Sequence, residues 1–139
     1  MHMAIKPFLA LLVLATMAGC QLGPDQQLVG AWTANRQLSK VPTIPFPEFG
    51  DRVERGVHST QLKLSADHTF ILTGLRQIGG AWKYENGVLT LSPATGADSP
   101  QMKLLDGLFH MKVNPDFSQM KATITSAFGP FVIVLDKTA

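Results

Sequence analysis

The chain contains a single cysteine among 139 residues, so no internal disulfide framework can stabilise it. Its charge is nearly balanced, with 12 Lys+Arg against 10 Asp+Glu, and the basic residues form no dense stripe of the kind that neutralises phosphates. Charged residues make up only 16% of the chain and apolar residues 45%, which excludes a disordered polyelectrolyte. These shortages predict one folded domain that does not bind nucleic acid.

Motifs of the common enzymes and metal sites are also missing. The sequence has no Cys-x-x-Cys, no His-Glu-x-x-His, no Gly-rich phosphate loop before a helix and no Gly-x-Ser-x-Gly. Beyond the first 20 residues the histidines are His58, His68 and His110, which we expect in a loop, a turn and a strand; their spacing suggests no catalytic triad. The sequence therefore predicts a protein that is not an enzyme and that uses no cofactor or metal.

Acidic residues come close together at one place. Glu48, Asp51 and Glu54 could supply paired carboxylates for acid–base chemistry. Arg52 and Arg55 interleave with them, a pattern typical of a solvated charged face. We interpret this segment as an exposed surface.

Soft metal ligands are present in the second half of the chain, where Met102, His110, Met111 and Met120 could bind copper. His110 and Met111 are neighbours in an expected strand and therefore face opposite sides of it. The three methionines fit the inward-facing set, where methionine fills irregular space in a core. We interpret them as core residues and His110 as an outward, solvated side chain.

The first 19 residues have the layout of an export signal. A weakly basic start with His2 and Lys6 precedes an apolar run over residues 8–15 and two small residues, Ala18 and Gly19. The run spans about 8 residues, well short of the roughly 20 that cross a hydrocarbon core. Removal of residues 1–19 as a signal peptide is therefore favoured over a transmembrane helix.

Met17-Ala18-Gly19-Cys20 resembles the bacterial lipobox, in which a signal peptidase cuts before a cysteine that then carries acyl chains. The resemblance implies lipidation of Cys20, a membrane anchor. Gln21 in place of Asp implies outer-membrane sorting, with the protein facing the periplasm. The polar residues 20–27 would then form a lipid-anchored tether. An ordinary secretory signal or a buried N-terminal helix with a free thiol is the alternative.

Residues 28–139 show the alternation of short antiparallel strands. Leu62 and Leu64 share one face and residues 70 and 72 continue it beyond a tight turn, which predicts a hairpin. A second hairpin is predicted around Asn86 and Gly87, a pair that favours a two-residue turn. Further strands are expected at residues 28–36, 102–104, 109–113, 120–124 and 131–135.

This rhythm predicts an all-β fold: a small antiparallel up-and-down barrel of about eight strands, or a sandwich. Residues 42–57 are the exception, since three prolines interrupt regular structure there. Phe46, Phe49, Val53 and Val57 then recur at helical spacing. We expect a short helical flap over one barrel end, with a signal helix preceding the domain.

The sequence apolar-x-Gly-Ala-Trp occurs twice, ending at Trp32 and at Trp82. With residues 64–70 and 80–91, these motifs resemble small bacterial lipocalin-like lipoproteins. The resemblance implies a barrel of that type, although the chain is smaller than a full lipocalin and His68 replaces the usual glycine of that turn.

The expected inward-facing side chains are mostly large, so we predict a filled barrel interior with any pocket confined to the mouth under the flap. These inward residues are Trp32, Leu62, Leu64, Phe70, Leu72, Trp82, Tyr84, Leu89, Leu91, Met102, Leu104, Phe109, Met111, Val113, Met120 and Ile124. The candidate ligand-lining residues are Trp32, Phe46, Phe49, Trp82 and Tyr84, each of which could equally be plain core.

The favoured function is that of a non-enzymatic envelope lipoprotein that binds a small apolar molecule or acyl chain at the barrel mouth. The alternative is an interaction or inhibitor module that presents its loops to another envelope protein, for which an exposed patch around Phe46 and Phe49 would be the sign. The sequence identifies neither the ligand nor a protein partner.

Overall fold

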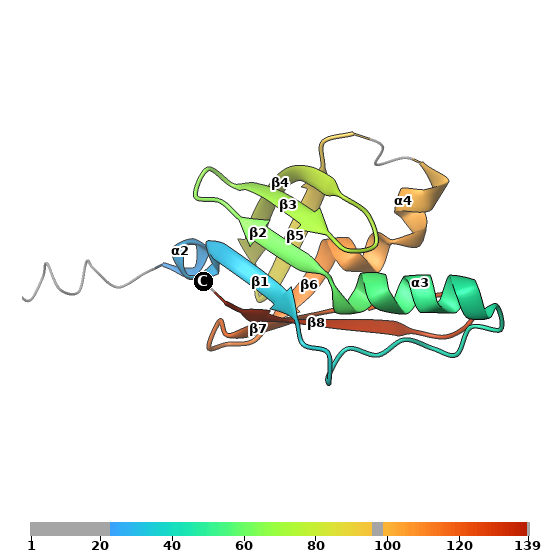
Figure 1. Ribbon diagram of the computed structural model, residues 1–139. Helices are drawn as coiled ribbons and strands as arrows, with labels where there is room; N and C mark the ends of the chain where they lie inside the picture. Colours follow the sequence, from blue (N-terminus) through green and yellow to red (C-terminus); the bar gives the residue numbers. More distant parts are fainter. Residues whose placement is uncertain (1–22, 96–98, 139) are drawn as a thin grey trace, which may run out of the picture.

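The computed structural model describes residues 23–95 and 99–138, and these residues form a closed barrel of eight antiparallel strands (Figure 1). The strands are β1 (Gly30–Ala34), β2 (Gln61–Leu64), β3 (Thr69–Thr73), β4 (Ile78–Glu85), β5 (Val88–Pro93), β6 (His110–Val113), β7 (Gln119–Ile124) and β8 (Phe131–Lys137). The signal peptide predicted at residues 1–19 and the lipidation site predicted at Cys20 lie outside the described residues.

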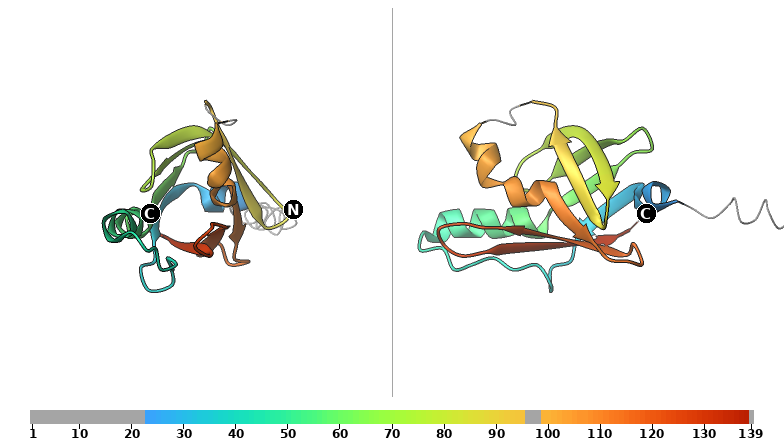
Figure 2. Two further views of the ribbon diagram at one scale, coloured as in Figure 1. Left: turned by 90° about the vertical axis from the view of Figure 1, so that its right-hand side faces the viewer. Right: turned by 180° about the vertical axis from the view of Figure 1, so that it is seen from behind.

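Each strand pairs with the next along the chain, and β1 closes the barrel by pairing with β8. Trp32 of β1 lies opposite Leu62 on one side and Lys137 on the other. The end-on view in Figure 2 shows the resulting ring of strands. The predicted barrel is confirmed, and closure decides between the barrel and the sandwich that the sequence left open.

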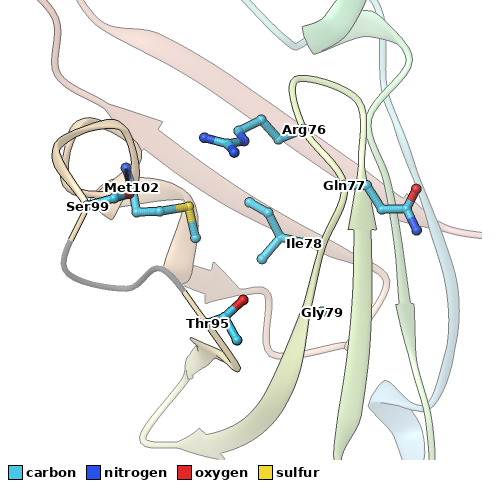
Figure 3. A pocket seen from close by; sticks show the side chains of 7 residues that line it. All are labelled: Arg76, Gln77, Ile78, Gly79, Thr95, Ser99 and Met102. Carbon is cyan, nitrogen blue, oxygen red and sulfur yellow. Dashed lines mark hydrogen bonds between the residues drawn. The ribbon is translucent and has the colours of Figure 1, made fainter.

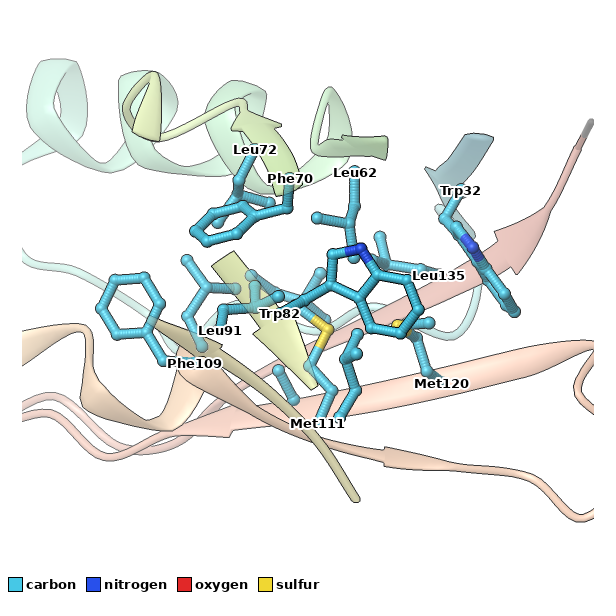
Figure 4. Close-up of a cluster of buried hydrophobic side chains, with 14 of the residues drawn as sticks. Trp32, Leu62, Phe70, Leu72, Trp82, Leu91, Phe109, Met111, Met120 and Leu135 are labelled. Atoms are coloured by element: carbon cyan, nitrogen blue, oxygen red, sulfur yellow. The ribbon is translucent and has the colours of Figure 1, made fainter. Parts of the chain in front are cut away.

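The barrel interior is filled by its own side chains (Figure 4). Period-two alternation places every second residue inside, as in β2, where Leu62 and Leu64 are 1% exposed and their neighbours are exposed. Of the predicted inward set, 14 residues are buried, Tyr84 is partly buried and Leu104 is exposed. The buried ones are Trp32, Leu62, Leu64, Phe70, Leu72, Trp82, Leu89, Leu91, Met102, Phe109, Met111, Val113, Met120 and Ile124.

Within the described part of the chain, four helical segments lie at the ends of the barrel. The short helix α2 (Pro24–Leu28) lies at one end, which we call the closed end (Figure 1). Helix α3 (Pro47–His58), helix α4 (Pro100–Leu104) and the 3-10 turn η1 (Asp106–Phe109) lie at the other, which we call the open end. Among the described residues no helix is long and apolar enough to cross a membrane.

The strand predicted at residues 102–104 is wrong, because this segment forms helix α4. Pro100 stands at its first turn, and the Ser99 side chain accepts a hydrogen bond of 3.2 Å from the Met102 amide. The cap therefore outweighs the two-residue alternation. Because residues two apart point in different directions on a helix, Leu104 is 71% exposed instead of inward, whereas Met102 is buried in the core as predicted.

The barrel fold begins before residue 28, within the segment expected to be a tether. Residues 24–28 form α2, with Pro24 in its first turn and the Gly23 amide donating to the Gln26 side chain. Leu28 is fully buried and packs in the core. Only the part of the predicted tether before Pro24 lies outside this helix.

Candidate functional site

At the closed end, Trp32 is fully buried and hydrogen-bonded. Its indole Nε1 donates to the Leu28 carbonyl at 2.9 Å, which ties β1 to α2. The Lys137 ammonium lies 5.9 Å from the centre of the Trp32 ring and donates to the Gln27 carbonyl. Trp32, a candidate ligand residue from the sequence, thus takes part in sealing this end.

Trp82, on β4, is buried and hydrogen-bonded in the same manner as Trp32 on β1. Its indole Nε1 donates to the Ser65 carbonyl at 3.1 Å, in the turn between β2 and β3. The His68 ring from the same turn lies against Trp82 with 4.4 Å between ring centres, and His68 Nε2 is 2.8 Å from the Asp25 carboxylate of α2. Trp82 is 3% exposed, so helix, turn and strand enclose it.

Tyr84 also lies toward the closed end. Its ring meets Phe117 edge to face, with 5.6 Å between ring centres, in the turn that joins β6 to β7. Trp32, Trp82 and Tyr84 therefore pack within or against the core, and none of them lines the large apolar hollow described below.

At the open end, α3 provides the predicted helical flap, over Pro47–His58 within and just beyond the expected 42–57 segment. Pro47 and Glu48 occupy its first turn and Arg55 and His58 its last turn, as the helix dipole favours. Its apolar face becomes less buried toward the N-terminus: Val57 is fully buried, Val53 packs against the core and Phe49 is 47% exposed. The start of the flap therefore lies away from the core.

Two glycines set the distance between α3 and the turn after β3. Gly74 has a φ of +130°, and a Cβ there would lie 2.8 Å from the Gly56 carbonyl oxygen and from Thr60. The buried Thr60 hydroxyl in turn donates to the Gly56 carbonyl at 3.0 Å. A Cβ on Gly56 would come within 2.8 Å of the Leu75 side chain. The helix is thus seated directly on this turn.

An open, mainly apolar pocket of about 630 Å³ lies between α3 and the barrel rim. Its walls come from the segment before α3, from α3, from the β3–β4 turn, from the α4–η1 junction and from the loop between β7 and β8, which extends beside α3 in Figure 1. The lining residues are Ile44, Phe49, Arg52, Val53, Gly56, Gly74, Leu75, Arg76, Leu104, Leu105, Ile124, Thr125, Ser126, Ala127, Phe128 and Phe131. Its volume falls within the range of about 300–1,000 Å³ of small-molecule sites.

Of the sequence-predicted lining residues, the structure brings Phe49 into this pocket. Phe46 lies at its edge, 60% exposed, where its ring meets Phe128 edge to face with 6.4 Å between ring centres. Phe128 is itself 42% exposed. An exposed aromatic pair therefore borders the pocket.

The charged residues that line the pocket are both arginines, Arg52 of α3 and Arg76 of the β3–β4 turn. The guanidinium group of neither arginine makes a hydrogen bond or ion pair with any residue that the structure describes. The Ser126 hydroxyl, in contrast, is engaged within its own loop, where it donates to the Gly129 carbonyl at 2.6 Å and accepts from the Phe128 amide. The pocket lining thus contains two arginines whose guanidinium groups have no partner among the described residues.

A second, smaller hollow of about 340 Å³ shares Arg76 with the first (Figure 3). Gln77, Thr95 and Ser99 give it a more polar lining, beside Ile78 and Met102. In Figure 3 the Arg76 side chain extends toward α4 above Ile78. Arg76 therefore stands between an apolar hollow and a polar one.

The sequence pattern groups Arg52 with its charged neighbours and therefore does not predict it as a pocket residue. The acidic residues Glu48, Asp51 and Glu54 are indeed exposed, and none lines the pocket. Phe49, Arg52, Val53 and Gly56 follow the i, i+3, i+4, i+7 pattern of one helix face, and this periodicity could have identified Arg52. Arg76 had no such signal, because only the closed barrel brings its turn beside α3.

The remaining titratable residues that the structure describes lie outside the lining of both hollows. No group of three or more His, Cys, Asp or Glu side chains in the described part of the chain could hold a metal ion. His110 is exposed, as expected, and lies 3.7 Å from Asp106.

Hydrogen bonds from the hydroxyl and amide of Thr69 lower the pKa of Asp67, and Ser118 lowers the pKa of Asp116 in the same way. Both aspartates stabilise turns at the closed end.

The fold is consistent with the lipocalin-like class that the sequence motifs suggested, at the level of a small closed antiparallel barrel. No protein-family model matches the chain, no curated protein is significantly similar to it, and no solved structure gives a significant match.

Proposed function

We propose that the protein is a non-enzymatic, lipid-anchored envelope lipoprotein that binds a small apolar molecule or a single acyl chain at the barrel mouth. The observation that carries this proposal is the apolar pocket of about 630 Å³ between α3 and the barrel rim. The fold leaves apolar surface open to water. When a ligand covers this surface, the complex is stabilised by about 25 cal/mol for each Å² removed from water. Because side chains fill the barrel interior, the ligand would bind at the mouth.

The experiment is native mass spectrometry of the full chain produced in a bacterial envelope, to detect a small molecule that co-purifies. In a Val53→Phe variant the added ring should occupy the pocket and reduce the bound fraction by about fivefold or more, because Val53 lines it. Glu54→Phe is the matched control, since the next residue of the same helix is exposed and lies outside the lining. Equal ligand loading of both variants, or no ligand in the parent chain, would contradict pocket binding.

The anchor is proposed from the lipobox resemblance at Met17-Ala18-Gly19-Cys20. Acylation of Cys20 would hold the domain at the bacterial outer membrane, facing the periplasm. A Cys20→Ser variant should move from the membrane pellet to the soluble fraction while its circular dichroism and melting temperature stay those of the barrel. Persistence of Cys20→Ser in the membrane pellet would show that another feature holds the protein there.

A protein-interaction or inhibitor role is the second candidate, favoured by the exposed Phe46–Phe128 pair and by the exposed Leu104 of the pocket wall. Phe46→Ala separates the two candidates, because Phe46 borders the pocket without lining it. For an interaction module this change should abolish retention of a partner protein. For a ligand-binding protein it should leave small-molecule loading within about twofold.

A further inference from the structure

We propose that the ligand of the mouth pocket is a single-chain amphiphile with an anionic head, held by Arg52 and Arg76, an inference that rests on the pocket-binding function proposed above. The two arginines of the pocket lining come from different elements, α3 and the β3–β4 turn. The walls between them and the barrel rim are mainly apolar. The site thus combines a surface for an acyl chain with two positive charges.

Charge complementarity identifies the head. No described acidic side chain lines the pocket, and neither arginine is neutralised by another described residue. A guanidinium group presents a planar fork of N–H donors that matches a carboxylate or phosphate with two parallel hydrogen bonds. An ammonium head would instead meet two like charges, and an uncharged head would leave both arginines without a counter-charge.

The surroundings fix the orientation of the ligand. Val53, Leu75 and Phe131 line the apolar part and also pack on or within the core, so they lie on the barrel side of the pocket. Arg52 and Arg76 are exposed side chains on its solvent side, and Arg76 also borders the polar hollow. The chain would therefore lie against the barrel rim with its head at the water-facing arginines.

The seating of α3 keeps the two arginines in a defined relation. Gly56 belongs to the same face of α3 as Arg52, and Gly74 precedes Arg76 by two residues. The contact between these glycines fixes the helix to the turn, because a Cβ at Gly74 would overlap the Gly56 carbonyl. The two arginines are thus carried by elements that touch each other.

The test is isothermal titration calorimetry of the full, unacylated chain in mildly alkaline buffer with four probes that share a dodecyl-length chain: dodecanoate, dodecyl phosphate, 1-dodecanol and dodecyltrimethylammonium. We expect at least one anion to bind about tenfold or more tightly than the alcohol, and the cation to bind most weakly. The carboxylate and phosphate arms distinguish the two sources of negative charge.

Arg52→Gln and Arg76→Gln should each weaken binding of the preferred anion about tenfold and leave dodecanol within about twofold. Arg55→Gln is the matched control, because it removes the same charge from α3 at an exposed position outside the lining. If all four probes bind equally and the arginine variants have no effect, the head assignment is overturned while pocket binding stands. If none of the probes binds, the proposed function fails as well.

Discussion

The two ends of this barrel are both rich in aromatic residues, yet they use them in opposite ways. At the closed end both indole N–H groups donate to backbone carbonyls, and Trp32 and Trp82 are 3% exposed or less. At the open end the aromatics are phenylalanines, which have no polar group to pair, and Phe46, Phe49 and Phe128 are all 42% exposed or more. One end therefore stabilises the fold, and the other leaves apolar surface for binding.

The difference follows from what each end must satisfy. Tryptophan needs a hydrogen-bond acceptor when it is buried, and α2 and the Ser65 turn supply one each. At the open end, the C-terminal half of α3 is held by the buried Val57 and by the contact of Gly56 with Gly74 in the turn after β3. The N-terminal half of α3 extends beyond the core. A pocket results because the helix is fixed at one end only.

The largest effect is expected from truncating the buried Trp32 of the closed end, and it is compared with truncation of the exposed Phe49 of the open end. Trp32→Ala should lower the free energy of unfolding by about 3–5 kcal/mol, since it empties a fully buried site and leaves the Leu28 carbonyl without its donor. Phe49→Ala should cost about 1 kcal/mol or less, because about half of that side chain is already in water. Urea denaturation of both variants measures the two values. Similar losses would remove the distinction between the ends.

The next effect concerns the seat of α3. Gly74→Ala should destabilise the fold by about 2–4 kcal/mol, because alanine disfavours a φ of +130° and its Cβ would overlap Gly56 and Thr60. Hydrogen exchange should become faster in α3 of this variant, since the helix would lose its contact with the turn after β3.

Gly87→Ala is the control for the seat of α3. Gly87 also has a positive φ, of +81°, but no described atom lies within 4 Å of the place that a Cβ would take. Only the backbone cost of about 1–2 kcal/mol therefore applies, and α3 should keep its protection. Unchanged α3 protection in Gly74→Ala as well would place the seat elsewhere.

The smallest effect is a pH dependence at the closed end. Hydrogen bonds from Thr69 lower the pKa of Asp67 in the folded state. The Asp67 carboxylate therefore stabilises the fold in full at pH values above the pKa that Asp67 has in the unfolded chain. That contribution is lost as the pH falls through the lower, folded-state pKa. Asp67→Asn should therefore melt slightly below the parent protein at neutral pH and together with it in strong acid, below the folded-state pKa of Asp67.

The exposed aspartate Asp51 of α3 provides the control for this pH series, since its carboxylate makes no hydrogen bond or ion pair with any described residue. The melting temperature of Asp51→Asn should differ from that of the parent protein by the same small amount at neutral pH and in strong acid. A gap between Asp67→Asn and the parent that persists unchanged in strong acid would mean that the charge of Asp67 is not what stabilises the turn.

The barrel itself was predictable from sequence because its strands are governed by a local rule. Alternation in Leu62–Leu64 and around Asn86-Gly87 gives both the strands and the faces that are buried. The rule failed at Met102 and Leu104, where the Ser99 cap and Pro100 start a helix and alternation over two apolar residues cannot exclude it.

The pocket was predictable only in its general place. Aromatic side chains fill cores and line pockets alike, so sequence could not separate Trp32 and Trp82 from Phe49. Their hydrogen-bond partners, Leu28 and Ser65, decide this, and those contacts depend on α2 and on strand pairing. Likewise Arg52 and Arg76 line the same pocket because the fold brings α3 beside the β3–β4 turn, where Gly56 and Gly74 lie close together.

The most direct test of the central claim is a titration of dodecanoate into the ¹⁵N-labelled, unacylated full chain, followed by two-dimensional NMR. The chain has two tryptophans, so two indole N–H signals report on the closed end. We predict that backbone amide signals of residues 49–56, 74–76 and 124–128 shift while both indole signals stay in place. Shifts of the Trp32 and Trp82 indole signals, with the mouth residues unchanged, would contradict the account.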